Sequence, residues 1–410
     1  MRCNTASPGS SANPGASVSL VQINLQSHFG GGEVYTAFLC RALSKLGVST
    51  RLLVHPRANF WTRLGLPADT ERIAIADSSN LQQHLPTGPL WLLSHGPLPA
   101  ELRAASPNRL CTAIAHMPVQ DGDPAAFSAH DRIYAVSGWV RDGLKAAGLP
   151  AWDEPLYGIA DCITPTRACA ADDDIRRTSR YDWDRRKGRD RLLGLGEPFV
   201  EWLRPHPSFV RRDGLTIGIV SRLTPIKQFP LMFSHLAPVL ERHDGVHLEI
   251  FGSGGYASVR DLDRVLAMLP VGQVRFWGQQ RNVAAVYRQL DYLLSGLPEK
   301  EALGLNIIEA QACGTPVIAV NAPPFTETVV HGETGFLYRD PREDAGADFG
   351  RLLDELLAGR AKPRPELAQT HLARFSFDAF VERLRPVVAD AERTLAAREA
   401  QFPACKAGAR

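Results

Sequence analysis

Short apolar runs alternate with amphipathic stretches along most of the chain, a pattern typical of α/β folds. In the first half, apolar runs occur at 18–25, 49–55, 89–95, 110–116 and 131–137, and the last three end in polar residues. A glycine run, 30–32, and a segment with apolar residues at helical spacing follow the first apolar run. Strand, Gly-rich turn, helix and strand make a βαβ unit, which implies a parallel sheet.

A second alternation begins at 215–221 and repeats the pattern. Strands are predicted at 247–252, 274–278, 292–296 and 316–320, with helices at 229–242, 259–269, 283–290 and 305–313. Two such alternations predict an α/β protein with two Rossmann-like domains facing each other across a cleft. We expect an N-terminal domain at 18–213, which ends in a basic connector, a C-terminal domain at 214–377, and a final helix with a tail at 378–410.

Composition limits the function classes. The 410 residues are 44% hydrophobic and 22% charged, with a net charge of +2, which fits a soluble two-domain protein without a nucleic-acid partner. Residues 1–17 are small and polar and are expected to be a disordered tail, not a signal peptide. The chain has an odd number of cysteines, seven, without CxxC spacing. We therefore expect a reducing, cytoplasmic compartment and neither a disulfide scaffold nor a zinc site.

One segment departs from the near-neutral balance. Residues 176–212 hold 11 Lys and Arg against 5 Asp and Glu, interleaved with Tyr181, Trp183, Phe199 and Trp202. This is the composition of an ordinary amphipathic surface, including a surface helix. It also leaves open peripheral contact with the inner face of a membrane or with an anionic acceptor.

The candidate chemistry centres on 301–319, EALGLNIIEAQACGTPVIA. Gly304 lies at the expected turn into a helix, so the backbone N–H groups of Gly304, Leu305 and Asn306 would face a phosphate at a helix N-terminus. Glu309, about one turn into the helix, could accept hydrogen bonds from a ribose diol. Glu301 precedes the turn and could reach a sugar hydroxyl.

These residues carry a family resemblance. The E-x7-E spacing of Glu301 and Glu309, followed by EAxAxGTPVI, resembles the signature of the retaining GT-B glycosyltransferases, in particular family 4. In that family a basic pair after a strand binds the donor diphosphate, and Arg222 and Lys227 in IGIVSRLTPIK match it. Each cation about 4 Å from the leaving group contributes roughly 4 kcal/mol at an effective dielectric of about 20. Two cations and a helix N-terminus could therefore replace a metal ion.

The resemblance also implies roles outside that stretch. Gly252 matches a glycine turn beside the nucleotide, and Gly31 and Gly32 match a loop that closes over the phosphates. His116 matches a strand-end histidine near the transferred sugar. The final helix matches one that crosses back to the N-terminal domain.

Three features depart from the family pattern. The usual Glu-Gly-Phe-Gly is Glu301-Ala302-Leu303-Gly304 here, and Gln228 replaces a glycine after the lysine. Residues 165–213 match no part of the family. The first two differences weaken any inference about which sugar is held.

Other polar residues have competing interpretations. The strand-end His95 and the loop residue His28 are weaker active-site candidates than His116. Three acidic triplets resemble the metal-binding DxD of another glycosyltransferase fold, but their number favours loop or surface acids: Asp121 with Asp123, Asp172–Asp174, and Asp182 with Asp184.

We therefore expect an EC 2.4 glycosyltransferase that needs no cofactor or metal. It would move a sugar from a nucleoside-diphosphate sugar to a carbohydrate or lipid-linked hydroxyl acceptor, in polysaccharide or glycolipid biosynthesis. A sugar-nucleotide 2-epimerase of the same fold, an NAD-dependent oxidoreductase and a non-catalytic binding subunit stay open as alternatives. The lack of GxGxxG with a distal acid counts against the oxidoreductase.

Overall fold

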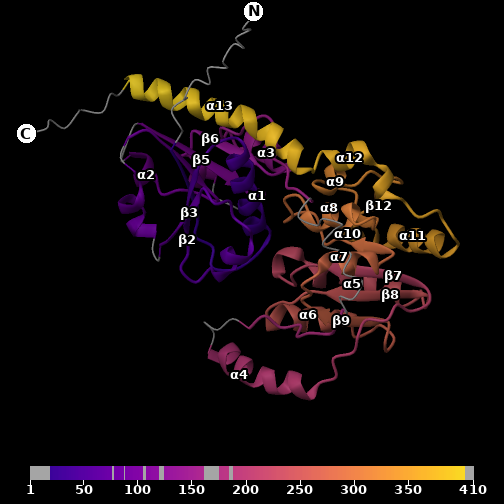
Figure 1. The fold of residues 1–410 in the computed structure, drawn as a ribbon. Coiled ribbons are helices and arrows are strands. Elements are labelled where there is room, and N and C mark those ends of the chain that lie inside the picture. Colours follow the sequence, from indigo (N-terminus) through magenta and orange to yellow (C-terminus); the bar gives the residue numbers. More distant parts are fainter. Residues whose placement is uncertain are drawn as a thin grey trace, which may run out of the picture. The chain divides into compact units, whose positions relative to one another are not determined.

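The computed structural model describes residues 19–75, 78–86, 88–104, 108–119, 124–160, 175–183 and 188–401. Two six-stranded sheets dominate the fold (Figure 1). The first has the order β3-β2-β1-β4-β5-β6, and the second β12-β11-β10-β7-β8-β9. Each sheet grows outward in both directions from its first strand, β1 or β7, which is the doubly wound Rossmann order. The predicted α/β class with two Rossmann-like sheets is confirmed.

The strands are short and mostly buried. In chain order they are β1 (Leu20–Asn24), β2 (Thr50–Val54), β3 (Thr70–Ala74), β4 (Leu90–Ser94), β5 (Arg109–Ala115), β6 (Arg132–Ala135), β7 (Leu215–Val220), β8 (Val246–Phe251), β9 (Val274–Gly278), β10 (Tyr292–Leu294), β11 (Val317–Val320) and β12 (Gly335–Tyr338). Every strand pairing with a described register is parallel.

Helices connect these strands. The α-helices are α1 (Gly31–Lys45), α2 (Ala100–Ala104), α3 (Gly138–Ala146), α4 (Gly188–Leu203), α5 (Phe229–Leu240), α6 (Tyr256–Leu266), α7 (Val283–Arg288), α8 (Leu305–Ala312), α9 (Phe325–Thr328), α10 (Pro341–Asp344), α11 (Ala347–Leu357), α12 (Gln369–Ala373) and α13 (Phe377–Gln401). Short 3-10 turns lie at Asn59–Arg63, Ser78–His84, Pro124–Phe127, Pro225–Lys227 and Pro365–Leu367. Within the described residues, no helix is both long and apolar enough to cross a bilayer.

The chain divides into two compact units. Unit 1 comprises 1–113, 129–131 and 384–410, and unit 2 comprises 114–128 and 132–383. The last helix, α13, contributes its first residues to unit 2 and the remainder to unit 1. There Arg398 pairs with Asp131, with Nη2 at 2.7 Å from Oδ1. The described part of the basic connector belongs to unit 2.

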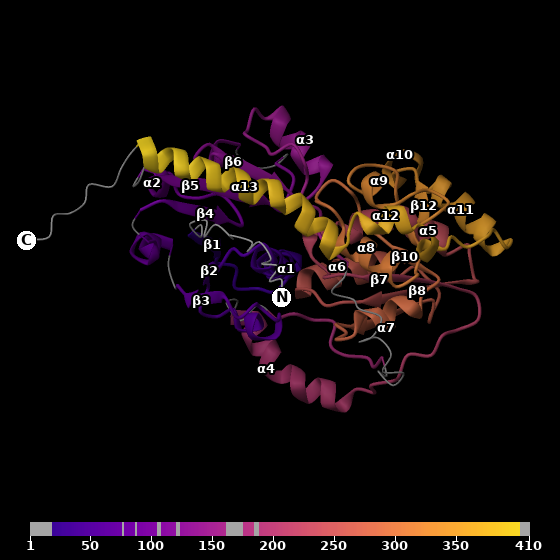
Figure 2. The ribbon, with the colours of Figure 1, turned by 45° about the horizontal axis from the view of Figure 1, so that its top comes forward.

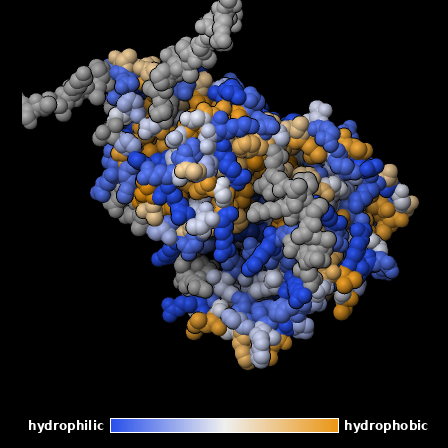
Figure 3. Space-filling view, in the orientation of Figure 1, coloured by the Kyte–Doolittle hydropathy of each residue, from blue (hydrophilic) through white to orange (hydrophobic). Residues whose placement is uncertain are grey.

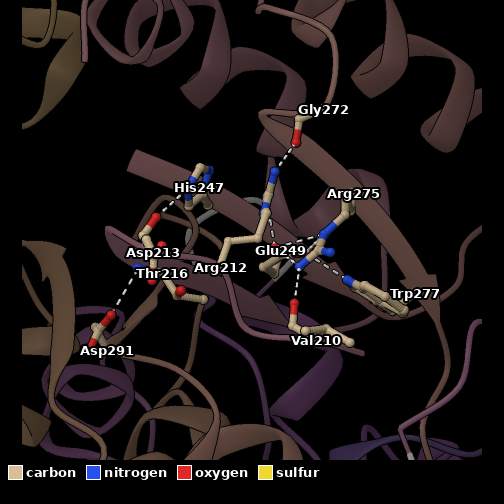
Figure 4. A network of polar contacts seen from close by, with 10 residues as sticks. All are labelled: Val210, Arg212, Asp213, Thr216, His247, Glu249, Gly272, Arg275, Trp277 and Asp291. Carbon is tan, nitrogen blue, oxygen red and sulfur yellow. Dashed lines mark hydrogen bonds and ion pairs between the residues drawn. The ribbon is translucent and has the colours of Figure 1, made fainter. Parts of the chain in front are cut away.

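A buried acid fixes the end of this connector to the second sheet (Figure 4). Glu249 on β8 is only 1% exposed and accepts hydrogen bonds from Arg212 at 2.8 Å and from Trp277 at 2.7 Å. Arg275 on β9 pairs with the same carboxylate at 2.5 Å and donates to the Val210 carbonyl at 3.1 Å. Two guanidinium groups compensate the buried charge and join 210–212 to β8 and β9.

The core of unit 2 requires glycine at one buried strand position. A Cβ on Gly218 of β7 would come within 2.3 Å of the Leu290 side chain. The missing side chain lets the segment before β10 pack directly against the first strand of the sheet. Figure 2 shows the sheet of unit 2 with helices on its two sides.

Candidate donor site of unit 2

The candidate donor residues gather where the strand order of the second sheet reverses. β7 lies between β8 and β10, and the chain continues outward on one side through β9 and on the other through β11. Open α/β sheets bind ligands outside the carboxyl ends of strands at such a switch point. The Asn306 amide, in the first turn of α8, donates to the carbonyl of Val220 at the end of β7, at 3.2 Å. This bond fixes the start of α8 beside β7.

Lys227 and Glu301 form an ion pair at this edge. The Lys227 ammonium donates to the Glu301 carboxylate, and the two side chains are 24% and 16% exposed. The backbones approach closely here too, because a Cβ on Gly296 would lie 2.6 Å from the Lys227 carbonyl oxygen. The loops after β7 and β10 thus bring together Lys227, which is predicted to bind phosphate, and Glu301, which is predicted to bind the sugar. Arg222, at the start of the same loop, is exposed.

Gly252 brings the end of β8 against the end of β7. Its φ is +150°, and a Cβ there would lie 1.9 Å from the Ser221 carbonyl oxygen. Gly254 is equally constrained, with the Leu223 carbonyl oxygen 2.1 Å from its virtual Cβ. A hydrogen bond from the Leu223 N–H to the Ser253 carbonyl, at 2.9 Å, joins the two loops. The glycines therefore fix the path of the Arg222 loop.

Helix α8 presents its N-terminus to the same edge. Gly304, its N-cap, has a left-handed conformation with φ +82°, which glycine adopts without the strain of a side chain. No acidic residue lies in the first turn of α8. Its first N–H groups and its dipole therefore favour an anionic ligand at Leu305 and Asn306.

Glu309 lies within α8, one turn from its start. Its carboxylate accepts a hydrogen bond from the Tyr287 hydroxyl at 3.0 Å. Burial raises the pKa of Glu309 to about 7, and the bond from Tyr287 opposes this rise. A carboxyl group with this pKa can change its charge near neutral pH when a new hydrogen-bond donor reaches it.

His116 directly follows β5 and belongs to unit 2. Burial lowers the pKa of His116 to about 4, so the ring is neutral at pH 7. A neutral imidazole can donate a hydrogen bond to a sugar hydroxyl or accept one from it, and it adds no charge to the site.

The N-terminal glycine loop belongs to unit 1. Gly31 and Gly32 are the first residues of α1, and Gly32 accepts a hydrogen bond from Thr36 at 2.8 Å. Glu33, in the same turn, is buried, and Asn24 donates to its carboxylate at 3.5 Å. This acid places a negative charge at the helix end where a phosphate contact was predicted, a feature that the glycine run alone did not reveal.

The remaining sequence candidates lie in separate settings. His95 joins a polar network of unit 1, with Nε2 at 3.2 Å from the Gln22 side chain and Nδ1 at 3.3 Å from Thr36. His28 contacts its neighbour Ser27 at 3.0 Å. Of the acidic triplets, only Asp182 lies within the described residues, where it is exposed. Among the residues that the structure describes, no three His, Cys, Asp or Glu side chains cluster as metal ligands would.

Sequence reasoning missed Glu327, on α9. Its carboxylate accepts hydrogen bonds from the backbone N–H groups of Gly138 at 2.8 Å and Trp139 at 2.6 Å, and from the Tyr157 hydroxyl at 3.0 Å. Ser137 caps the same helix, α3, by accepting from Val140 at 3.1 Å. A carboxylate at a helix N-terminus is electrostatically favourable. Glu327 thus connects two segments nearly 190 residues apart.

Comparisons with known proteins identify relatives of this chain. Residues 214–358, most of the second alternation, match the family model described as glycosyl transferases group 1. The D-inositol 3-phosphate glycosyltransferase of Rhodococcus erythropolis is 25% identical over 398 residues, 85% of this chain and 84% of that protein. The protein of the same name from Acidothermus cellulolyticus is 34% identical over 205 residues, 46% of this chain and 44% of the relative.

Solved structures share the fold. Anabaena HepE in complex with UDP superposes with a TM-score of 0.63 at 15% identity, over 91% of this chain and 100% of that one. A glycosyltransferase from Rickettsia africae gives a TM-score of 0.63 at 16% identity, over 92% and 99% of the two chains. The chain is therefore a glycosyltransferase with the GT-B fold, and its residues 214–358 are similar to the group 1 glycosyl transferases.

Proposed function

We propose that the protein transfers a sugar from a nucleoside-diphosphate sugar to a hydroxyl acceptor, with retention of anomeric configuration and without a metal ion. The observation that carries the proposal is the meeting of Lys227, Glu301 and the N-terminus of α8 at the switch point of the second sheet. An ammonium and a helix N-terminus both favour the charge that develops on a leaving diphosphate. That HepE was crystallised with UDP and with UDP-glucose supports a donor of this class.

Each residue has a defined part in this proposal. Lys227 and Arg222 bind the diphosphate together with the N–H groups of Gly304, Leu305 and Asn306, while Gly252 fixes the loop that carries Arg222. On donor binding Lys227 exchanges its contact with Glu301 for a phosphate oxygen, and Glu301 becomes free to accept from a sugar hydroxyl. Glu309 accepts hydrogen bonds from the ribose.

The remaining roles concern the transferred sugar and the acceptor. His116 contacts the sugar as a neutral ring, and Gly31 and Gly32 cover the phosphates. The leaving phosphate takes the acceptor's proton as its bond to the anomeric carbon breaks. The acceptor belongs to polysaccharide or glycolipid biosynthesis in the cytoplasm, an assignment that rests on the family resemblance.

The deciding experiment measures thermal stabilisation of the purified protein by UDP-, GDP- and ADP-sugars in EDTA. A ligand at 100 times its Kd stabilises a folded protein by about 2.7 kcal/mol. We expect one nucleotide series to raise the melting temperature, and the rise to vanish in Lys227→Ala. A rise that requires an added divalent metal, or that occurs only with NAD(H), would overturn the proposal. Product formed from donor alone would instead favour the epimerase.

A further inference from the structure

Helix α4 has its polar side toward the protein and its apolar side toward solvent. Leu192, Leu195, Phe199 and Trp202 are 72%, 74%, 63% and 74% exposed. Their spacing places them on one face of the helix. Helices of globular proteins normally bury such a stripe, so this orientation is reversed.

The opposite face explains why the helix is held in this orientation. Asp190 is 7% exposed, Gly194 would place a Cβ 3.2 Å from the Trp183 side chain, and Glu197 accepts a hydrogen bond from Ser179. The missing side chain of Gly194 lets the helix lie directly on Trp183. These residues follow one another at helical spacing, opposite the apolar stripe.

Aromatic and polar contacts support the helix. Trp183 stacks on Tyr256 of α6, with ring centroids 6.1 Å apart and an interplanar angle of 20°. At the far end of the helix, the His206 ring contacts the Glu201 carbonyl at 2.8 Å. In Figures 1 and 2 α4 runs along the outside of unit 2, and Figure 3 shows hydrophobic side chains on the surface at the lower edge, where α4 lies.

Positive charge gathers beside the apolar stripe. A cavity of about 450 Å³ next to the end of α4 is lined by Arg177, Arg180, Arg204 and Arg275, with Thr178 and Phe276 among its other walls. Arg180, Arg204 and Arg275 pair with Asp263, Glu201 and Glu249, and Arg212 shares Glu249 with Arg275. With Arg177 of the cavity wall included, five arginines face three carboxylates in this cluster.

We propose that α4 docks unit 2 on an anionic lipid surface, with the apolar stripe in the headgroup layer and the arginine cavity against lipid phosphates. A helix of 16 residues is about 24 Å long and can lie along the surface with its apolar face inserted. Phe199 and Trp202 are residue types that favour the membrane interface. A second copy of the chain is the poorer occupant, because pairing two such surfaces would bring like charges together.

The test is flotation of the full-length protein with vesicles. We expect binding to phosphatidylcholine vesicles that contain phosphatidylglycerol, and little binding to phosphatidylcholine alone or at high salt. Leu195→Glu with Phe199→Glu should weaken partitioning at least about tenfold. The matched control is Val271→Glu with Leu367→Glu, which changes two exposed apolar residues of unit 2 by the same charge and should bind like the wild type.

Other outcomes would overturn the proposal. These are an absence of vesicle binding, equal losses in both double variants, or a dimer in sedimentation velocity that only Leu195→Glu with Phe199→Glu dissociates. The wild type should show a blue shift of tryptophan fluorescence with vesicles, and Trp202→Phe should still bind while losing most of that shift; a shift that Trp202→Phe retains in full would place α4 outside the lipid surface. Docking through α4 does not depend on the donor site, so donor titration without vesicles separates its failure from that of the proposed reaction.

Discussion

The ammonium of Lys227 is neutralised by the carboxylate of Glu301 at the edge of the second sheet. In the proposed reaction these two groups serve different parts of one donor. Their pairing keeps the loops after β7 and β10 together before any substrate arrives, and it prevents either charge from being left alone in a partly buried place.

Replacement of Lys227 by Ala should weaken binding of the nucleoside diphosphate roughly 10- to 100-fold, because a charge-assisted hydrogen bond is lost. Isothermal titration calorimetry with UDP or GDP measures this loss of affinity. Lys362→Ala is the matched control, since Lys362 also pairs with a carboxylate, Asp291, at 3.4 Å, but outside the site. Equal losses in both variants would contradict the role of Lys227.

Replacement of Glu301 by Gln should separate nucleotide binding from sugar binding. The diphosphate should bind at least as tightly as in the wild type, because Lys227 no longer has a competing carboxylate. The sugar nucleotide should lose the additional affinity that its sugar provides. Titration of both ligands against both proteins gives the comparison, and a loss of diphosphate affinity would show that Glu301 acts only by positioning Lys227.

Glu309 should make stability and donor affinity depend on pH. Its folded-state pKa of about 7 exceeds the ordinary 4.5, so its protonation favours the folded state at low pH, and this contribution is lost as pH rises from about 4.5 to about 7. Glu309→Gln should therefore gain stability relative to the wild type over that interval, by about 2 kcal/mol after allowance for partial exposure. Urea unfolding at several pH values measures this difference.

The same shift affects donor binding in the opposite direction. A ribose diol that donates to Glu309 favours the carboxylate, so the wild type should bind donor more tightly as pH rises to about 7. The Gln variant should lack this dependence. A wild-type Kd that stays constant over the interval would remove Glu309 from the ribose site.

Gly252 and Gly255 offer a paired test of the loop after β8. Gly252→Ala should destabilise the fold by about 1–3 kcal/mol or distort the Arg222 loop, because its Cβ would lie 1.9 Å from the Ser221 oxygen. Gly255→Ala meets no atom within 4 Å and should be within about 0.5 kcal/mol of the wild type. Thermal unfolding and donor titration of the two variants show whether the close approach matters.

Glu327 should contribute to stability through the N-terminus of α3. Glu327→Gln removes the charge that two backbone N–H groups and the Tyr157 hydroxyl share, and should cost about 1–3 kcal/mol. Glu333→Gln, an exposed acid nearby in sequence, should be nearly neutral. If the two variants unfold alike in urea, the contacts of Glu327 carry little energy.

The sequence predicted the buried elements well because their apolar periodicity is strong. The runs at 18–25 and 215–221 became β1 and β7, and the segment after the glycine run became α1. β3 was missed because TERIA is largely exposed and lacks an apolar run, and β12 because GFLY is short. Edge strands draw much of their definition from pairing with a neighbour, which local sequence does not express.

Interactions between distant side chains were beyond the sequence. Lys227 and Glu301 were each assigned to a ligand, and nothing in their spacing of 74 residues indicates that they pair. Glu327 was not singled out from the sequence, because its partners are mainly backbone groups of Gly138 and Trp139, which no sequence pattern links to it. The connector was recognisable as basic and aromatic, but the direction of the apolar face of α4 required Asp190 and Gly194 to be placed in three dimensions.

The buried carboxylate of Glu249 has a consequence for how this protein can diverge. Loss of Glu249 alone would leave Arg212 and Arg275 without their shared counter-charge, while loss of both arginines would leave a carboxylate that is 1% exposed without a cation. Neither loss is tolerable unless the remaining positions of the cluster change as well. Positions 212, 249 and 275 should therefore covary among descendants of a common ancestor, and lineages that discard the acid should replace all three positions with apolar residues.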